Sequence, residues 1–421
     1  MHPDFLRQAS HWLSLIYHGA VSVFLLGIVL QTFANLRVFR APRPRVFAPD
    51  ADTPFVSVLV PARNEAHRIG PCVASLLAQD YPADRYELLV LDDHSQDGTA
   101  AVVQALGLTV TTDEINAATS PRRIVLSSAS LPAGWTGKAW ACHQLAQAAR
   151  GDFFLFTDAD TVHAPGTLGA AVGHALATDA SLLSLWPRQQ TETWSERLVI
   201  PLVYLLVLGL LPLALLDFFQ RHPAVARRVP FGLRRALGAA NGQFLLFRRK
   251  TYARIGGHAA VRAHLVEDVA LGRLVSERTG GDFHGRLVNC DGSRLVACRM
   301  YRSFPELWEG FTKNLRAAFD HAHLAFWVSG VVQGTVLVLP FLFAGSPLLA
   351  GRWWPLALAQ AACIYGLRAL FAARFRTSWF GVLAHPFGQI LALAIAFNSW
   401  RLSTRRGVSW KGRIYRLQPD V

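Results

Sequence analysis

Four long apolar runs constrain the fold of this chain more than any other feature of its sequence. They cover residues 12–36, 324–343, 354–372 and 380–397, and a helix needs about 20 apolar residues to cross a hydrocarbon core. Hydrophobic residues make up 52% of the 421 positions and charged residues only 17%, which is too apolar for an ordinary soluble enzyme. The sequence therefore predicts a large domain attached to a membrane by apolar segments before and after it.

Basic residues follow the first apolar run and indicate on which side of the membrane the domain lies. The run is too long for a signal peptide, lacks a small-residue cleavage pattern, and is followed by Arg37, Arg40, Arg43 and Arg45. We therefore interpret residues 1–45 as a retained anchor with a basic flank. Because cytoplasmic flanks are enriched in basic residues, the sequence predicts a multi-pass protein of a bacterial-type inner membrane with its main domain in the cytoplasm.

The net charge of +14 raises the question of a nucleic-acid partner. The arginines cluster beside apolar runs, at residues 37–45, 221–235 and 401–416, and no basic-aromatic motif for nucleic acid accompanies them. Phospholipid headgroups are the simpler partner for such clusters. The sequence therefore predicts contact with a membrane surface and no nucleic-acid binding.

Between the first anchor and residue 324, short β-rich runs alternate with amphipathic stretches. This alternation is typical of stacked βαβ units and predicts an α/β domain with a mainly parallel, Rossmann-like sheet. Ligands in such sheets bind beyond the carboxyl ends of the strands, so the residues that directly follow the strands are the candidate ligand-binding residues. Strands are expected at residues 55–60, 87–91, 123–127, 153–157 and 182–186, and helices at 67–79, 98–106, 139–150 and 165–177.

Paired carboxylates follow two of the expected strands. Asp92 and Asp93 follow one strand, while Asp158 and Asp160 follow the apolar run 153–156. Aspartate also caps helices, but capping does not require two carboxylates at each position. Asp158 and Asp160 present hard oxygen ligands one residue apart, which suit Mg²⁺ or Mn²⁺ held together with a diphosphate.

Five short motifs occur in one order along the chain, at residues 57–65, 90–99, 137–139, 157–160 and 267–268. Their order and spacing resemble the family 2 glycosyltransferases, which have the GT-A fold. The resemblance covers roughly residues 55–319 and implies a GT-A domain at residues 46–323.

The resemblance implies a binding site for a nucleotide-sugar donor, most commonly a UDP-sugar in this family, although GDP donors occur. One group of residues would hold the nucleoside and diphosphate: Pro61, Ala62, Glu65, Asp92, Asp93, Lys138 and Asp158. Lys138 would lie near the diphosphate, because an ammonium group acts as a point charge on phosphate. A solvated residue at a helix start is the alternative interpretation of Lys138.

Glu267 and Asp268 begin an expected helix, and in the family the second acidic residue of this pair is the general base. An alcohol is a poor nucleophile at neutral pH, and a positioned base typically contributes about 10²–10⁴ in rate. The resemblance therefore implies a single displacement at the sugar C1 with inversion, without a covalent intermediate. The alternative for both residues is a carboxylate placed to favour the helix dipole.

The resemblance also indicates an acceptor side, at Asn241, Gly242, Gln243, Arg299 and Trp308. Gln243 would either contact sugar or cap a turn. Processive polysaccharide synthases of this family carry Q-x-x-R-W near residues 299–314, and this chain departs from that pattern. It looks closer to the hopanoid-associated and carotenoid glycosyltransferases. The implied acceptor is a hydroxyl of a membrane lipid, whether an isoprenoid, carotenoid, hopanoid or glycerolipid.

A fifth apolar stretch, residues 198–219, creates a topological conflict. If it crossed the bilayer, Asp158 and Asp268 would lie on opposite sides and no common site could form. Pro201 and Pro212 interrupt it, so we expect an interfacial or re-entrant segment. Three crossings within 324–398 would likewise place the basic tail 399–421 outside, so we expect 380–397 to be re-entrant.

Two other enzymes and one non-enzyme fit parts of the pattern. A sugar transferase that loads polyprenyl phosphate has an anionic acceptor and needs no general base. A polysaccharide synthase would use the same donor site. A transporter or membrane scaffold with a nucleotide-binding domain is the alternative outside enzymes, although little charge apart from Arg368 lies within the apolar runs.

Overall fold

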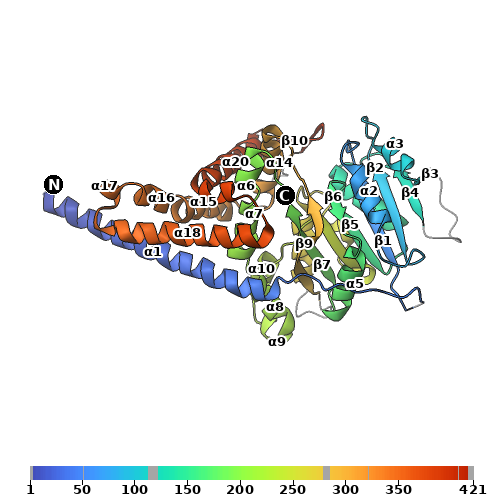
Figure 1. Ribbon diagram of the computed structural model, residues 1–421, viewed down its shortest axis with the longest axis horizontal. Helices are drawn as coiled ribbons and strands as arrows, with labels where there is room; N and C mark the ends of the chain where they lie inside the picture. The colour runs from blue at the N-terminus through green and yellow to red at the C-terminus, as the bar shows by residue number, and fades with distance from the viewer. Residues whose placement is uncertain are drawn as a thin grey trace.

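The computed structural model describes residues 3–50, 52–111, 122–277, 285–320, 322–405 and 407–415. The molecule is elongated, with long helices at one end and a sheet domain at the other (Figure 1). The first helix, α1 (Pro3–Val38), runs from the far helical end towards the sheet domain.

In the described part of the chain, nine strands form the sheet of this domain, in the order β3-β4-β2-β1-β5-β8-β7-β9-β6. The first five strands of that order run parallel to one another, whereas β8 runs antiparallel to both β5 and β7. The start of β8 therefore lies at the same edge as the ends of β1, β2 and β5. The strand bounds are β1 Val56–Ala62, β2 Tyr86–Asp92, β3 Thr109–Thr111, β4 Arg123–Ser127, β5 Phe153–Thr157, β6 Thr161–His163, β7 Leu182–Gln189, β8 Phe244–Arg248 and β9 Leu287–Cys298.

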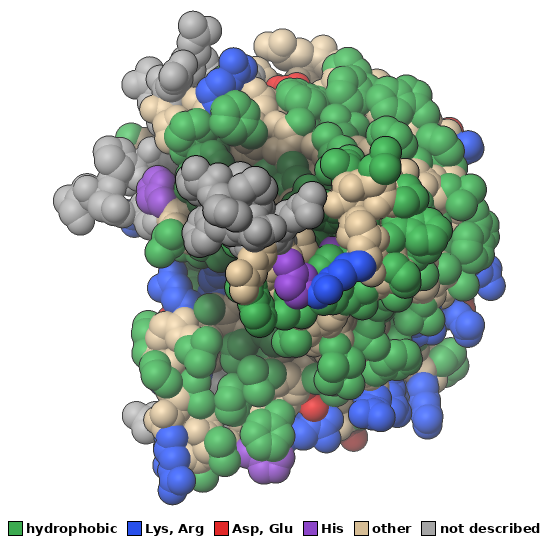
Figure 2. Space-filling model, turned by 90° about the vertical axis from the view of Figure 1, so that its left-hand side faces the viewer, with side chains coloured by type: hydrophobic (Ala, Val, Ile, Leu, Met, Phe, Trp, Pro, Cys, Tyr) green, Lys and Arg blue, Asp and Glu red, His purple; other side chains and the backbone are tan. Residues whose placement is uncertain are grey.

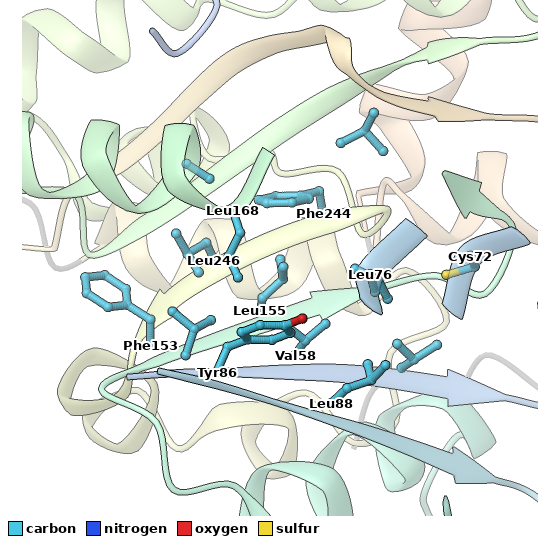
Figure 3. Close-up of a cluster of buried hydrophobic side chains, with 14 of the residues drawn as sticks. Val58, Cys72, Leu76, Tyr86, Leu88, Phe153, Leu155, Leu168, Phe244 and Leu246 are labelled. Atoms are coloured by element: carbon cyan, nitrogen blue, oxygen red, sulfur yellow. The ribbon is translucent and has the colours of Figure 1, made fainter. Parts of the chain in front are cut away.

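Helices cover both faces of the sheet, as the alternating pattern predicts. Successive residues of a strand point to opposite faces, so Val58 joins one buried cluster and Leu59 the other. The first cluster packs strands against α2 and α5 (Figure 3). The helices of this domain are α2 Ile69–Leu77, α3 Thr99–Ala105, α4 Gly137–Ala148, α5 Thr167–Ala177, α11 Arg249–Arg254, α12 Gly257–Ala260, α13 Glu267–Glu277 and α14 Phe304–Ala317.

Three helical stretches of the described chain are long and apolar enough to cross a membrane: His11–Val38, His323–Ala344 and Pro347–Phe375. Hydrophobic side chains cover much of the helical end of the molecule (Figure 2). These stretches agree with the first three apolar runs of the sequence. The helices after the sheet domain are α15 His323–Leu337, α16 Leu339–Ala344, α17 Pro347–Ala350, the 3₁₀ turn η2 Gly351–Trp353, α18 Trp354–Phe375, α19 Trp379–Leu383 and α20 His385–Arg405.

The segment between β7 and β8 leaves the sheet domain and returns to it. Its apolar part is bent by 42° between Leu210 and Leu213, around Pro212. Both ends of the segment join neighbouring strands of one sheet, so the segment begins and ends at the sheet domain. Its interfacial or re-entrant arrangement stays a prediction. The segment contains α6 Trp194–Val199, α7 Leu202–Leu205, the π-helical turn η1 Leu206–Leu210, α8 Leu213–Arg221, α9 Pro223–Ala226 and α10 Phe231–Ala236.

Side chains of α1 satisfy the backbone groups that this bend exposes. The amide nitrogen of Asn35 donates to the carbonyl oxygens of Leu208 and Leu211, at 2.9 and 2.7 Å. The amide oxygen of Asn35 accepts from the backbone N–H of Ala214 at 2.9 Å. In an apolar surrounding an unpaired backbone group costs several kcal/mol, so Asn35 fixes the bent segment against α1.

Arg368 has a comparable role on α18. It is buried and donates to the carbonyl oxygens of Pro201 at 2.8 Å and Gly381 at 3.1 Å. The charge noted in the third apolar run therefore joins α18 to the break between α6 and α7 and to α19.

The last apolar run folds back towards the sheet domain. Its helices, α19 and α20, do not belong to the candidate spans of the described chain. Instead α20 packs along α14, where the amide of Asn398 donates to the hydroxyl of Thr312 at 3.1 Å. The chain then forms a small hairpin, β10 (Val408–Trp410) and β11 (Arg413–Tyr415), which contacts the sheet domain. The re-entrant arrangement of residues 380–397 stays a prediction; residues 406 and 416–421 of the basic tail lie outside the described structure.

We predict that Asn35→Leu destabilises the protein, because it removes the three hydrogen bonds that hold the bent segment against α1. The expected loss is about 2–4 kcal/mol, visible as a lower thermal unfolding midpoint of the purified protein in detergent. Phe33→Leu is the control, since Phe33 lies on the exposed side of the same helix. An unchanged midpoint for Asn35→Leu would contradict the assigned role.

Candidate active site

A cavity lies at the edge of the sheet where β1, β2 and β5 end and β8 begins. Residues of α4, α13 and α14 and of the C-terminal hairpin complete its wall. Twelve residues singled out in the sequence line it: Pro61, Ala62, Glu65, Asp93, Lys138, Asp158, Asp160, Asn241, Gly242, Gln243, Glu267 and Asp268. The structure thus brings together both acidic motifs and the turn before β8.

Asp158 and Asp160 enter the cavity from the end of β5. The hydroxyl of Thr161 donates to the carbonyl oxygen of Asp158 at 2.7 Å and holds the turn between them. Oxygen Oδ1 of Asp160 is buried without a hydrogen-bond partner. Burial, reinforced by the charge of Asp158, raises the pKa of Asp160 to about 7. A buried carboxylate oxygen without a hydrogen-bond partner, next to a second carboxylate, is suited to bind a divalent cation.

The described protein residues do not form a complete metal centre by themselves, because no group of three or more His, Cys, Asp or Glu side chains is placed to hold an ion. Two carboxylates would therefore supply part of a coordination shell. Ligand oxygens and water would have to supply the rest, as is usual for Mg²⁺.

Lys138 lies between the two acidic motifs. It follows the cap residue Thr136 in the first turn of α4. Its ammonium nitrogen is 2.7 Å from Oδ1 of Asp158 and 2.9 Å from Oε1 of Glu267. Burial alone would lower the pKa of Lys138, but the two carboxylates outweigh burial and hold it above its ordinary value. Lys138 therefore stays charged and links β5 to α13.

Asp268 is held at the start of α13 by two backbone groups. Gly242 donates its N–H to Oδ2 at 2.6 Å, and Val269 donates its N–H to Oδ1 at 2.8 Å. Burial, with the charge of Glu267 as the next contribution, raises the pKa of Asp268 to about 6. Such a carboxylate is ionised at neutral pH and more basic than an ordinary aspartate, as a general base requires.

The neighbouring carboxylate of Glu267 behaves in the opposite way. Burial would raise its pKa, but the ion pair with Lys138 outweighs burial and lowers it. The surroundings thus separate the pKa values of two adjacent acidic residues, a pattern found where acid and base roles are divided.

The turn before β8 lies so close to Asp268 that position 242 must be a glycine. A Cβ atom at position 242 would lie 2.9 Å from Oδ2 of Asp268, closer than side chains tolerate. The amide of Gln243 meanwhile donates to the sulfur of Cys298 at 3.0 Å, and its oxygen accepts from Gln189 at 2.8 Å. Gln243 is thus bound into the protein, at the wall of the cavity.

Three residues singled out in the sequence do not line the cavity. Asp92 accepts the N–H of Ser95 at 3.3 Å and shapes the loop after β2. Arg299 pairs with Glu192 and Glu196 at the start of α6. Trp308 packs against Phe304, with ring centroids 5.7 Å apart.

Several cavity residues were not singled out in the sequence. Lys313 and Asn314 come from α14, and Lys411, Arg413 and Tyr415 come from the C-terminal hairpin. Burial lowers the pKa of Lys313 to about 8. One signal was present in the composition: the chain has only four lysines, and three of them line this cavity.

A mainly parallel sheet that gathers paired carboxylates and several cations at one edge is typical of an enzyme that binds its ligand beyond the strand ends. Comparison with protein families gives the narrower class. Residues 57–232 match glycosyl transferase family 2, and residues 209–421, just over half of the chain, match glycosyl transferase family 21. The chain belongs to the glycosyl transferases that these two families describe, and its sheet domain has the GT-A fold.

Individual proteins similar to this chain include a 4,4'-diaponeurosporenoate glycosyltransferase of Staphylococcus aureus. It is 26% identical over 378 residues, which cover 87% of this chain and 89% of the relative. Among solved structures, a mannosyltransferase from Pyrobaculum calidifontis in complex with GDP-Man and Mn²⁺ is 20% identical, covers 92% of this chain and 99% of that chain, and has a TM-score of 0.49. The structure of TarS 1–349 of S. aureus in complex with UDP is 15% identical to this chain. The match covers 86% of this chain and 95% of that chain, with a TM-score of 0.37.

We predict that Gly242→Ala lowers turnover roughly 10²-fold, because the new methyl group must displace the carboxylate of Asp268 and misplacements of about 1 Å have effects of this size. Initial rates of sugar transfer measure this. Gly166→Ala is the matched control, since a Cβ atom there meets nothing within 4 Å. Wild-type turnover in Gly242→Ala would show that the position of Asp268 is unimportant.

Proposed function

We propose that this chain is an inverting, metal-dependent glycosyltransferase that moves a sugar from a nucleotide diphosphate sugar to a hydroxyl of a membrane lipid. The main support is the geometry of Asp268. This carboxylate has a raised pKa, is fixed by two backbone N–H groups, and shares one cavity with Asp158 and Asp160. The proposal gives the enzyme a base for the acceptor and an acidic pair for the donor.

The donor would occupy the edge of the cavity formed by the ends of β1 and β2. Pro61, Ala62, Glu65 and Asp93 line this part, and Asp92 supports the loop beside it. Lys138 bridges Asp158 and Glu267 and would offer its remaining N–H donor to the diphosphate. A UDP-sugar is the donor that we propose.

Asp158 and Asp160 would hold Mg²⁺ or Mn²⁺. The orphaned Oδ1 of Asp160 and the adjacent carboxylate of Asp158 supply the expected hard oxygen ligands. When bound, the cation would offset negative charge on the leaving diphosphate.

The reaction that fits this arrangement is one displacement at the sugar C1. The acceptor oxygen forms the new bond to C1 as the bond from C1 to the diphosphate oxygen breaks. The proton of the acceptor hydroxyl passes to Asp268. Glu267 stays ionised and, with Lys138, holds the start of α13 in place. One displacement inverts the configuration at C1, and no carboxylate acts as a nucleophile.

The acceptor side would begin at Asn241, Gly242 and Gln243 and extend along α14. Lys313 and Asn314 of this helix line the cavity, whereas Leu315 lines a second, mostly apolar groove. That groove lies between α15 and α20, among the apolar helices. A lipid with its hydroxyl in the cavity and its chain in the groove fits this arrangement, and an isoprenoid such as a carotenoid or hopanoid is the class that we favour.

We further propose a cytoplasmic sheet domain in a bacterial-type inner membrane. The basic flank after α1 supports a cytoplasmic domain, because cytoplasmic flanks are enriched in Lys and Arg. The hairpin that contacts the cavity would then return the tail to the same side. The proposed units remain residues 1–45 as anchor, 46–323 as GT-A domain with the 198–219 segment at the interface, 324–398 as C-terminal membrane region and 399–421 as tail.

We expect kcat/KM to fall about tenfold per pH unit below about pH 6, because protonated Asp268 cannot accept the acceptor's proton. Asp268→Asn should lower turnover by about 10²–10⁴ and remove this acid limb. The assay uses purified full-length protein, labelled UDP-sugar and lipid, with the exposed Asp84→Asn as control. Near-normal turnover of Asp268→Asn would instead favour an acceptor that is already an anion, such as a polyprenyl phosphate.

Removal of divalent cations should abolish transfer, and Mn²⁺ or Mg²⁺ should restore it. In Asp160→Asn the metal concentration for half-maximal activity should rise by about tenfold or more, since even groups that only support metal ligands affect affinity 10–100-fold. Titration of the apo-enzyme with Mn²⁺ measures this. Full activity in excess EDTA would contradict the metal assignment.

A further inference from the structure

The C-terminal hairpin brings two cations to the donor side of the cavity. Trp410 pairs with Arg413 across a two-residue turn, at which Lys411 and Gly412 both have positive φ, 45° and 77°. Two positive φ values are typical of the tight turns that join hairpin strands. The turn carries Lys411 at its tip and Arg413 at its base, and both line the cavity.

Both cations of the hairpin contact carboxylates that we assign to the donor-binding part of the cavity. The guanidinium of Arg413 binds both oxygens of Asp93, at 2.6 and 3.0 Å. The ammonium of Lys411 contacts Glu65 and donates to the carbonyl oxygen of Arg63 at 2.9 Å. Asp93 and Glu65 are buried and follow β2 and β1. The last described residues of the chain thus cover the site that begins some 350 residues earlier.

The charge of the cavity depends on these two residues. Six acidic and six basic side chains line it, and the hairpin supplies two of the six cations. Without Lys411 and Arg413 the wall would carry two excess negative charges, which would repel a diphosphate. With the hairpin in place the formal charges of the wall balance, and the proposed Mg²⁺ or Mn²⁺ would add positive charge for a diphosphate.

We propose that the hairpin, residues 407–415, is a clamp for the nucleoside diphosphate part of the donor. This inference rests on the proposed function and adds a binding element to it. Without donor, Lys411 and Arg413 neutralise Glu65 and Asp93. When donor binds, the two cations contact its phosphates, and the carboxylate of Asp93 is released to accept hydrogen bonds from the nucleoside.

The test measures nucleotide affinity in the full-length protein in nanodiscs, by calorimetry with UDP or GDP, whichever binds the wild type more tightly, and Mn²⁺. We expect Lys411→Ala and Arg413→Ala each to weaken binding by about tenfold or more, as loss of a charge-assisted hydrogen bond does. The double variant should lose more, and Arg413→Lys should retain part of the affinity. Lys250→Ala and Arg401→Ala, which remove cations outside the cavity, should bind as the wild type.

A second measurement needs no substitution. In the wild-type protein, the same nucleotide should slow amide hydrogen exchange in the peptide that contains residues 407–415. Unchanged exchange would overturn the clamp even if the hairpin variants failed to fold.

The outcomes separate the clamp from the proposed function. Wild-type affinity in the double variant, alone or with a lowered unfolding temperature, would overturn the clamp and identify the hairpin as a static cover, while the proposed function stands. Tighter binding in the variants would also overturn it, since the hairpin would then compete with the donor. A wild-type protein that binds neither nucleotide would overturn both.

Discussion

The ammonium group of Lys138 between Asp158 and Glu267 is the interaction on which the rest of the site depends. Carboxylates from separate parts of the sheet domain meet at one edge, and their repulsion in a buried cavity would open it. Lys138 joins the end of β5 to the start of α13 and thereby fixes Asp268, the adjacent residue. Gly242 completes this arrangement because only a residue without a side chain allows its N–H to reach Asp268 so closely.

The same interaction constrains the membrane part of the molecule. The chain leaves the sheet after β7, bends at Pro212 and must return to β8 before Glu267 can reach Lys138. Asn35 on α1 stabilises the bend with three hydrogen bonds, and Arg368 on α18 stabilises the break near Pro201. Polar residues in the apolar helices thus serve the shape of the segment that links two halves of the active-site domain.

Local patterns were enough to predict the sheet and most of the acidic site. The expected strands 123–127 and 153–157 agree with β4 and β5 at both ends, and the acidic residues after β5 line the cavity. Contacts across long sequence distances were not predictable. Arg299 pairs with Glu196, 103 residues away, and Arg413 reaches Asp93 across 320 residues. No local periodicity encodes such pairs, so the sequence placed Arg299 in the site and left the hairpin out.

The central claim, transfer of a sugar to a membrane lipid, is tested most directly by mass spectrometry of lipid extracts. Cells with the intact gene, cells without it, and cells with only the Asp268→Asn form are compared. We predict an apolar lipid, heavier by one sugar residue than its precursor, that is present only with the intact gene, together with accumulation of the precursor in the other two. Unchanged lipids combined with an altered surface polymer would contradict the account.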